Sequence, residues 1–462
     1  AVARVRTMPA DVLPAHIVRN LAQKEYDRRK AAALEIEQTI QELRYAGNQE
    51  RVQAVVDFIV TELAQSPIPN VRKGALHALA GAAIGLREDV PRYLPALLPP
   101  VLSSFTDPDC RVRYYACESL YNIAKVARAH CMTHFNAIFE ALFKLSADTD
   151  LGVQNGFQLL DRLMKDIVAE SGTFDMAGFI PLLRRRVFVA NSYTRQFLIG
   201  WISILDAVPE IDMLQHLPDF FDGLFHMLSD ANKEIRQQAY AVLYDFLQEI
   251  KSSTDIEYSP IVAILVQHCA SRDRFSRLTA ITWLHDLATQ GHGRLLPHAA
   301  TVLEAVLKSI SHAEEEIRDA AISTDGALRE LLSTSEEGQF DVGAIIATLV
   351  RHMRSDRMSS RLSALQWLSM LLTQSPKALL SHAESVWPPL LDTLADESEE
   401  VVHLDLEVIA RFASQPGYFR EALAQVVGQL RANRGLLEHR SPLVARQLAA
   451  LLPARELFPK IA

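Results

Sequence analysis

The sequence predicts an all-α protein built from repeated helical hairpins. The chain has 462 residues, and about half of them are apolar. Only 18 are glycines, a smaller share of the chain than the usual ~7%. Glycine-based turns and strands are therefore scarce. Because a single hydrophobic core stops growing near ~250–300 residues, a chain of this length forms either several domains or a one-dimensional array of repeats.

A recurring pattern favours the array. It consists of an acidic residue, then four or five residues, an aliphatic residue, often an arginine, and then a small residue. Asp107-Pro-Asp-Cys-Arg-Val-Arg113 and Asp230-Ala-Asn-Lys-Glu-Ile-Arg236 are the clearest copies. The aliphatic anchor or its equivalent recurs at intervals of 41 residues at Val71, Val112, Val153, Thr194 and Ile235. Weaker copies, with less even spacing, are expected at Leu278, Ile317, Leu362 and Val401.

The period of this pattern indicates a known class of fold. Repeats of ~40–47 residues with two helices each are typical of HEAT and armadillo proteins. Residues 94–105 have the apolar spacing of a first helix. Asp107 and Pro108 suit the N-cap and first position of a second helix, which we expect over 112–126. The sequence therefore predicts a HEAT/armadillo-like α-α superhelix, a solenoid of roughly ten to eleven helical hairpin repeats.

Such an array has consequences for function. The acid and the arginine of the pattern are expected to pair between neighbouring repeats, which is an architectural role. No repeat can bury its apolar face alone, so neighbours stack and leave long surfaces suited to binding other proteins. Catalysis needs an enclosed pocket, which this layout does not favour.

Composition and motifs argue against several classes of function. The net charge of −9 disfavours nucleic acid as the main partner, because phosphate binding needs a basic surface. No stretch approaches the ~18 uninterrupted apolar residues of a membrane span. The four cysteines form no C-x-x-C pair, which indicates reduced thiols in a cytosolic compartment. Phosphate-binding loops, zinc-protease motifs and the nucleophile elbow are absent, so we expect no enzyme activity, cofactor or metal site.

Two groups of side chains have alternative interpretations. His130, Cys131 and His134 are close in sequence, but structural zinc sites normally use four ligands, and a polar turn between helices is favoured. Tyr114 and Tyr115 point about 100° apart on a helix, so we expect only one to be fully interior. The other would serve either packing between repeats or partner binding.

Several collinear segments resemble one family. Residues 109–128, which include Arg113-Tyr-Tyr-Ala-Cys-Glu118, resemble the signature region of the vacuole-morphology HEAT-repeat scaffold, the Vac family of the PIKfyve/Fab lipid kinase complex. HEAT architecture requires neither this motif nor Asp161-Arg-Leu-Met-Lys-Asp166, which makes the resemblance specific. It continues at residues 24–37, 159–171, 179–184, 195–197 and 396–410.

The resemblance implies a non-catalytic scaffold. Such proteins bind and activate a phosphatidylinositol-3-phosphate 5-kinase, link it to a SAC-type phosphoinositide phosphatase, and so regulate phosphatidylinositol 3,5-bisphosphate synthesis. The implied location is cytoplasmic and peripheral on endosomal and vacuolar membranes, with membrane contact through the complex and no nucleic acid partner. A generic HEAT adaptor for another cargo, of the nuclear-transport or phosphatase-scaffold type, would have the same fold, and fold alone does not decide function.

The resemblance also divides the chain. We expect a HEAT-repeat solenoid over residues 10–415, within which residues 69–163 contact the kinase. Residues 416–462 correspond to the beginning of the family's C-terminal region for phosphatase binding and homo-oligomer formation, which continues further in the family. The implied kinase-contact positions are Arg72, Lys73, Arg113, Tyr114, Tyr115 and Glu118.

Overall fold

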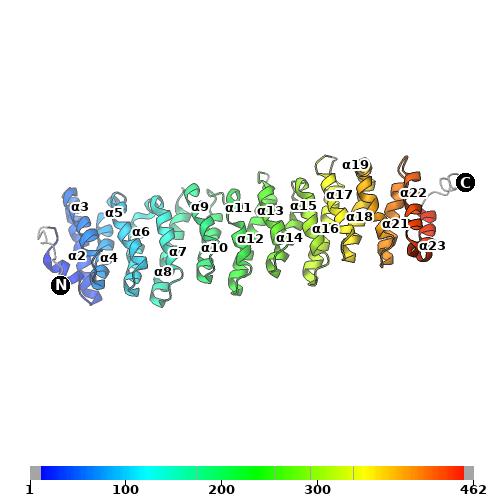
Figure 1. Cartoon of the computed structure of the whole chain (residues 1–462). Helices are drawn as coiled ribbons and strands as arrows, with labels where there is room; N and C mark the ends of the chain where they lie inside the picture. Colours follow the sequence, from blue (N-terminus) through cyan, green and yellow to red (C-terminus); the bar gives the residue numbers. More distant parts are fainter. Residues whose placement is uncertain (1–11, 173, 254, 292, 337, 452–462) are drawn as a thin grey trace. The chain divides into compact units, whose positions relative to one another are not determined.

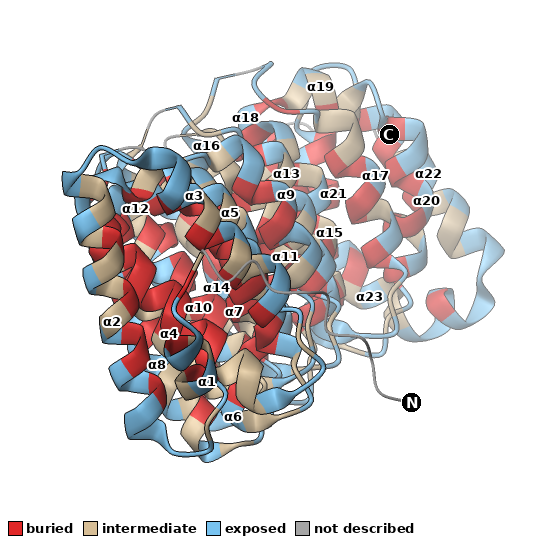
Figure 2. Ribbon diagram, turned by 90° about the vertical axis from the view of Figure 1, so that its left-hand side faces the viewer, coloured by how far each residue is buried: buried red, intermediate tan, exposed pale blue. Residues whose placement is uncertain are grey.

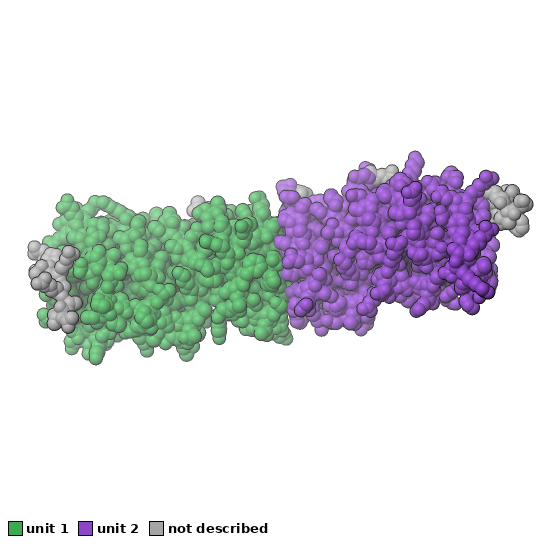
Figure 3. All heavy atoms as spheres, in the orientation of Figure 1, with its two compact units in different colours: residues 1–242 green, residues 243–462 purple. Residues whose placement is uncertain are grey.

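The computed structural model describes residues 12–172, 174–253, 255–291, 293–336 and 338–451, and all regular structure within them is helical. The chain divides into two compact units, residues 1–242 and 243–462 (Figure 3). Each unit is a stack of helical pairs (Figure 1), with a shorter first helix and a longer second helix in each pair. Most second helices pack on neighbouring second helices, and first helices contact both neighbouring first helices and the second helix of their own pair, which gives each unit two layers.

Unit 1 begins at the N-terminal end of the chain. Its first helices are α1 (Ala15–Leu21), α3 (Gln49–Phe58), α5 (Val90–Ser103), α7 (Phe135–Leu145), α9 (Met176–Arg186) and α11 (Leu217–Met227). Its second helices are α2 (Tyr26–Tyr45), α4 (Pro69–Leu86), α6 (Cys110–Ala127), α8 (Leu151–Glu170), α10 (Ser192–Asp206) and the first half of α12 (Lys233–Ser252).

Unit 2 repeats the same arrangement. Its first helices are α13 (Tyr258–His268), α15 (Ala299–Ser309), α17 (Val342–Met353), α20 (Ala383–Thr393), preceded by the short α19 (Pro376–Leu380), and α22 (Phe419–Ala432). Its second helices, after the end of α12, are α14 (Arg274–Gln290), α16 (Glu315–Ser333), α18 (Met358–Gln374), α21 (Glu399–Ala413) and α23 (Arg434–Leu451).

Short helical turns extend or join these helices. One is a π-helical turn, η1 (Ile59–Leu63), which continues α3. The others are 3-10 turns: η2 (Arg87–Asp89), η3 (Ser104–Thr106), η4 (Arg128–His134), η5 (Leu214–His216) and η6 (Leu296–His298). The helical pairs, from α1 and α2 to α22 and α23, confirm the predicted repeat architecture. The first helix expected over 94–105 corresponds to α5 with η3, and the second helix expected over 112–126 corresponds to α6.

The hydrophobic core lies between the two layers, where the facing sides of the helices are buried (Figure 2). On α6 the fully buried apolar residues recur at helical spacing and include Val112, Ala116, Leu120, Ile123 and Ala127. Each pair therefore buries its apolar stripe on the neighbouring pairs, since one hairpin alone cannot remove it from water.

The expected N-cap of α6 is wrong. The cap is Asp109, whose carboxylate accepts hydrogen bonds from the backbone N–H groups of Arg111 at 2.8 Å and Val112 at 3.4 Å. Asp107 instead accepts a hydrogen bond from the backbone N–H of Asp109 at 2.9 Å and pairs with Arg72. In Asp-Pro-Asp, both aspartates satisfy the N-cap preference, so composition alone did not separate the two roles.

The anchors expected at Leu278 and Leu362 are also wrong. Buried serines, Ser276 and Ser360, occupy the positions equivalent to Val112, and the two leucines are only half-buried. The anchors therefore recur every 41 residues, with one interval of 43 before Ser360. A serine is accommodated because its hydroxyl is satisfied; that of Ser360 donates to the Leu307 carbonyl at 3.2 Å.

Helices α2 and α4 approach each other very closely. A Cβ atom added at Gly81 would lie 2.5 Å from the Ala33 carbonyl oxygen, and one at Gly85 would lie 2.7 Å from the Glu37 carbonyl oxygen. Only glycine allows the α4 backbone to lie against the α2 backbone in this way. The close approach brings side chains of α2, α4 and α6 together on one surface.

None of the described helices combines the length and the apolar character needed to cross a bilayer. Within the same residues, no three histidine, cysteine, aspartate or glutamate side chains are grouped so that they could hold a metal ion.

Candidate partner-binding surface

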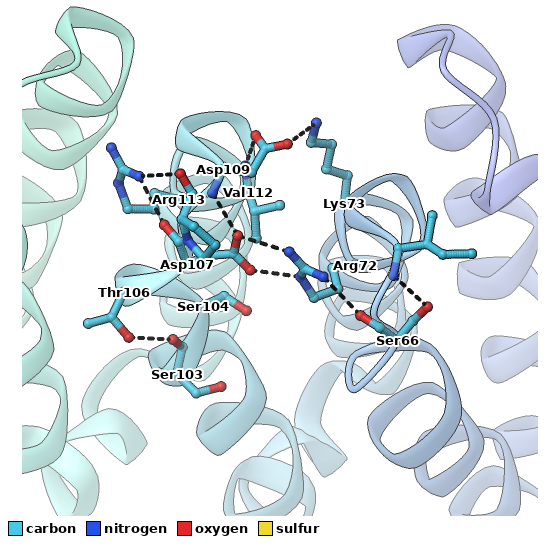
Figure 4. Close-up of polar contacts among 12 residues, drawn as sticks. Ser66, Arg72, Lys73, Ser103, Ser104, Thr106, Asp107, Asp109, Val112 and Arg113 are labelled. Atoms are coloured by element: carbon cyan, nitrogen blue, oxygen red, sulfur yellow. Dashed lines mark hydrogen bonds and ion pairs between the residues drawn. The ribbon is translucent and has the colours of Figure 1, made fainter. Parts of the chain in front are cut away.

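The pairing of acid and arginine predicted from the repeat pattern is present between consecutive second helices. Arg72, in the first turn of α4, donates from Nε to Asp107 Oδ2 at 2.7 Å and from Nη2 to Oδ1 at 3.0 Å (Figure 4). Its Nη1 also donates to the carbonyl oxygen of Ser66 at 2.9 Å. A two-point arginine–carboxylate pair fixes orientation as well as distance, so Arg72 ties the start of α4 to the turn before α6.

The same geometry recurs along the chain. An arginine pairs with an aspartate 35 residues later and donates to a carbonyl six residues earlier. We call these pairs the arginine–aspartate ladder: Arg72–Asp107, Arg113–Asp148, Arg195–Asp230 and Arg361–Asp396, with shortest N–O distances of 2.6 to 2.7 Å. The expected pairing between neighbouring repeats is thereby confirmed.

The ladder perturbs its acidic groups. Burial acts to raise the pKa of Asp148, but the hydrogen bonds from Arg113 and from the Asp150 backbone outweigh it and hold the pKa below its ordinary value. The pKa of Asp230 is lowered in the same way, because hydrogen bonds from the Asn232 backbone and from Arg195 outweigh the upward effect of burial. The ionised carboxylates are therefore stabilised by the fold.

Three of the predicted contact residues belong to this framework. The side chains of Arg72 and Arg113 are 16% and 17% exposed in their ladder pairs. Lys73 is 13% exposed and pairs with the cap residue Asp109 at 2.8 Å (Figure 4). Their charges are compensated within the chain, so their observed effect is to position α4 and α6.

The other three predicted residues lie in an aromatic group on the second-helix layer. This tyrosine cluster consists of Tyr26, Arg29 and Lys30 on α2, His77 on α4, and Tyr114, Tyr115 and Glu118 on α6. The Tyr115 ring lies 4.6 Å from that of His77 and stacks on that of Tyr26 at 6.1 Å. Tyr114 meets Tyr115 edge to face at 5.3 Å.

The expected division between one interior and one exposed tyrosine is wrong. Both Tyr114 and Tyr115 are half-buried. Tyr114 packs beside Gly156 of α8, and Tyr115 leans toward α4 and α2, so each ring fills a space between consecutive second helices. Tyr26 remains 38% exposed at the edge of the cluster.

The cluster is held by a buried arginine. Arg29 is 3% exposed and donates to the Tyr115 hydroxyl at 3.0 Å. Its Nη1 donates to the carbonyl oxygens of Gln23 and Lys24 at 2.9 and 2.7 Å. The guanidinium carbon lies 5.2 Å from the centre of the Tyr115 ring, an additional cation–π contact.

Charge on the cluster is set by its surroundings. Burial, with the nearby positive charges of Arg29 and Lys30, lowers the pKa of His77 to about 4, so this imidazole is neutral at neutral pH. Burial raises the pKa of Glu118, although Lys30, the Tyr26 hydroxyl and Arg29 act in the opposite direction. The surface therefore presents aromatic edges beside one cation and one partly buried acid.

The ladder is interrupted next to this surface. Gln154 stands where a ladder arginine would be, and Val189 stands where its aspartate would be. A cavity of about 300 Å³ lies here between α8 and α10, with Gln154, Lys165 and Tyr193 in its lining. On the same layer Leu159 of α8 is 65% exposed, which places a large apolar side chain in water.

Part of the lining of this cavity is a polar network between α8 and α10. Asp161 accepts hydrogen bonds from Trp201 Nε1 at 2.8 Å and pairs with Lys165 at 2.7 Å. Burial nonetheless raises the pKa of Asp161. The motif from Asp161 to Asp166, which HEAT architecture does not require, thus has a structural use in joining α8 to α10.

Sequence reasoning missed part of the cluster. Tyr26 and Arg29 lie in the segment 24–37 that resembles the Vac family, but nothing in the sequence connected them to Tyr115. His77 gave no signal, because it stands in the apolar run of α4. The group His130, Cys131 and His134 proved to be a 3-10 turn, η4, with Cys131 buried and the pKa of its thiol raised by burial to about 12.

The residues of this surface lie in a segment that matches a known family. A family model described as the Vacuolar 14 Fab1-binding region matches residues 70–166, which run from α4 to α8. The Protein VAC14 homolog of Arabidopsis thaliana is 46% identical over 449 residues, covering 97% of this chain. The chain is similar to VAC14 proteins over nearly its whole length. It spans 60% of the length of that Arabidopsis protein.

Two fungal VAC14 proteins match nearly the same share of the chain at lower sequence identity. The Protein VAC14 homolog of Schizosaccharomyces pombe is 29% identical over 96% of this chain and 68% of its own length. The Vacuole morphology and inheritance protein 14 of Saccharomyces cerevisiae is 25% identical over 96% of this chain and 68% of its own length. The similarity thus covers nearly the whole solenoid rather than the matched region alone.

Proposed function

We propose that this chain is a non-catalytic scaffold that binds a PIKfyve/Fab-type phosphatidylinositol-3-phosphate 5-kinase through the second-helix surface of residues 70–166. One observation carries the proposal: the Fab1-binding family model matches these residues. The same residues include two ladder pairs, Arg72–Asp107 and Arg113–Asp148.

The geometry supports binding by a preformed surface. The ladder and the Lys73–Asp109 pair hold α4, α6 and α8 in fixed register, so little conformational entropy would be lost on association. Within this proposal Arg72, Lys73 and Arg113 position the helices, and Tyr114, Tyr115 and Glu118 contact the kinase. Exposed Leu159 adds apolar surface whose burial on association would be favourable.

The remaining roles extend the same proposal. Binding to the kinase would activate it by holding it next to other components, and a SAC-type phosphatase would be recruited through the C-terminal part that begins with residues 416–462. Homo-oligomer formation would use the same part. The proposed setting is the cytoplasmic face of endosomal and vacuolar membranes, which agrees with the vacuole named in the description of the yeast relative.

A charge substitution at an exposed position tests the kinase surface. Leu159→Asp should reduce retention of a purified PIKfyve/Fab-type kinase by at least about tenfold, with unchanged helical content and melting temperature. Ile322→Asp is the matched control, since Ile322 is 47% exposed on a second helix of unit 2, α16. Equal retention by both variants would contradict the assignment of the surface.

A further inference from the structure

Unit 2 contains a groove that the proposed kinase surface does not use. It has a volume of about 590 Å³ and crosses α13, α15 and α17, within the range of ~300–1000 Å³ found for ligand sites. Small side chains make much of its lining, including Ala300, Ala305, Ala344 and Ala347. Such a lining lets a polypeptide backbone approach the helices closely.

The charged residues of the groove are mostly basic. Its lining contains the cations Arg277, Lys308 and Arg351 and a single acid, Glu304. Glu304 pairs with Lys308 at 2.9 Å and with Arg351 at 3.0 Å. The lining therefore has an excess of positive charge on a chain whose net charge is −9.

Arg277 is the ladder arginine of this repeat without its acid. Its Nε donates to the Ser271 carbonyl six residues earlier at 2.9 Å, as in the complete ladder pairs. The position 35 residues later is His312, whose Nδ1 accepts from the backbone N–H of Glu314 at 3.1 Å. Among the described residues, no carboxylate lies within ion-pair distance of Arg277, so its guanidinium faces the groove with its charge uncompensated.

We propose that this groove binds an acidic peptide segment of a partner protein, with a carboxylate of the peptide taking the ladder position opposite Arg277. Further carboxylates would meet Lys308 and Arg351, which are 65% and 62% exposed at the rim. Charge complementarity would set the orientation of the segment, and the alanines would accommodate its backbone. This inference is independent of kinase binding in unit 1.

The arrangement favours a peptide over a phosphate group or a lipid surface. Lys308 and Arg351 flank Glu304, so a dianionic phosphate placed between them would meet a carboxylate. Burial acts to raise the pKa of Glu304, but Lys308, His352 and Arg351 hold it below its ordinary value, and it stays ionised. Single carboxylates spaced along a chain can reach each cation separately. Arg277, moreover, is half-buried and cannot reach a flat bilayer.

The test uses the full chain and a defined probe. A short fluorescein-labelled peptide in which glutamate alternates with leucine should bind, as measured by fluorescence anisotropy at low salt, and the glutamine–leucine counterpart should not. Arg277→Glu should weaken binding by at least about tenfold. Arg354→Glu is the matched control, because Arg354 ends α17 outside the groove lining and carries the same charge change.

A steric variant separates binding from folding defects. Ala347 is exposed in the groove, so Ala347→Trp should fill it without altering the charge or the core. We expect this variant to lose the acidic peptide while keeping its melting temperature and its retention of the kinase. Unchanged affinity in both Arg277→Glu and Ala347→Trp would overturn the proposal. So would equal binding of the neutral peptide, or binding of anionic-lipid vesicles that the acidic peptide does not displace.

Discussion

Arg113 and Asp148 form a two-point ion pair, with Nε 2.6 Å from Oδ2 and Nη2 3.0 Å from Oδ1. The same guanidinium donates to the Asp107 carbonyl oxygen at 2.9 Å. One side chain therefore joins α6, the turn before α6 and the turn before α8. Because Asp107 pairs in turn with Arg72, the ladder connects three consecutive repeats at the surface that we propose binds the kinase.

Removing one ladder acid should destabilise the local stack. Asp148→Ala leaves Arg113 half-buried without its carboxylate, which we expect to cost about 2 kcal/mol. Chemical denaturation measures the loss, and hydrogen exchange should show it concentrated in α6 and α8. Asp166→Ala, at an exposed position of α8, is the control and should change little. A loss spread evenly over both units would disagree with this local role.

Acid should weaken the ladder. The carboxyls of Asp148 and Asp230 have pKa values below their ordinary value in the folded chain. Their contribution to stability is therefore complete above the ordinary pKa of ~3.9 and is lost as pH falls through the folded pKa. In urea titrations from about pH 6 to about pH 2, the stability difference between the native chain and Asp148→Asn should shrink toward acid. A difference that stays constant would refute the linkage.

A charged side chain introduced into the core of α6 should unfold the surrounding repeats before unit 2. Leu120 is completely buried between repeats, so Leu120→Arg introduces an unpaired buried charge, at a cost of about 3–5 kcal/mol. Because stability in repeat arrays is mainly a nearest-neighbour property, limited proteolysis should cut around α6 before it cuts unit 2. Simultaneous cleavage of both units would show that the array unfolds as a single cooperative body.

The contact between α2 and α4 should tolerate no side chain. Gly81→Val places carbon atoms where the Ala33 carbonyl lies and should push α2 away, which separates Tyr26 from Tyr115. Melting temperature and kinase retention should both fall. At Gly326 on α16 a Cβ meets nothing within 4 Å, so Gly326→Ala is the control and should be neutral or stabilising. Retention that survives Gly81→Val would separate the tyrosine cluster from kinase binding.

A strained backbone position offers a stabilising substitution. Arg128, which ends α6, has φ 48° and ψ −127°, a conformation that favours glycine over other residues. Arg128→Gly should therefore raise the free energy of unfolding by about 1 kcal/mol, seen as a higher denaturation midpoint. Lys125→Gly, three residues earlier within α6, should lower it by a similar amount. If both variants lowered stability, the ion pair of Arg128 with Glu170 at 3.8 Å would matter more than the strain.

The regular features of the fold were predictable, because they depend on local pattern. Helical spacing of Val112, Ala116 and Leu120 predicted α6, and the recurrence of an acid and an arginine predicted the ladder. Buried Ser276 and Ser360 escaped prediction since hydrogen bonds, not apolarity, place them in the core. Their nearest leucines, two residues later, carried the stronger hydrophobic signal.

The candidate site was less predictable than the fold. Tyr114, Tyr115 and Glu118 are adjacent in sequence and could be found as a motif. Their neighbours Tyr26 and His77 come from two other second helices, and the close packing of α4 on α2, as at Gly81, was not predictable from the sequence. The repeat pattern predicted an internal acid partner for Arg72 and Arg113, and the resemblance alone suggested that they contact the kinase.

The fixed separation of 35 residues in the ladder has a consequence for synthesis of the chain. Each arginine obtains its aspartate as soon as the next stretch of that length has been added, so a repeat need not await distant segments. Contacts so local in sequence favour rapid folding. The nascent chain should consequently become protease-resistant stepwise from its N-terminal end while the ribosome is still extending it.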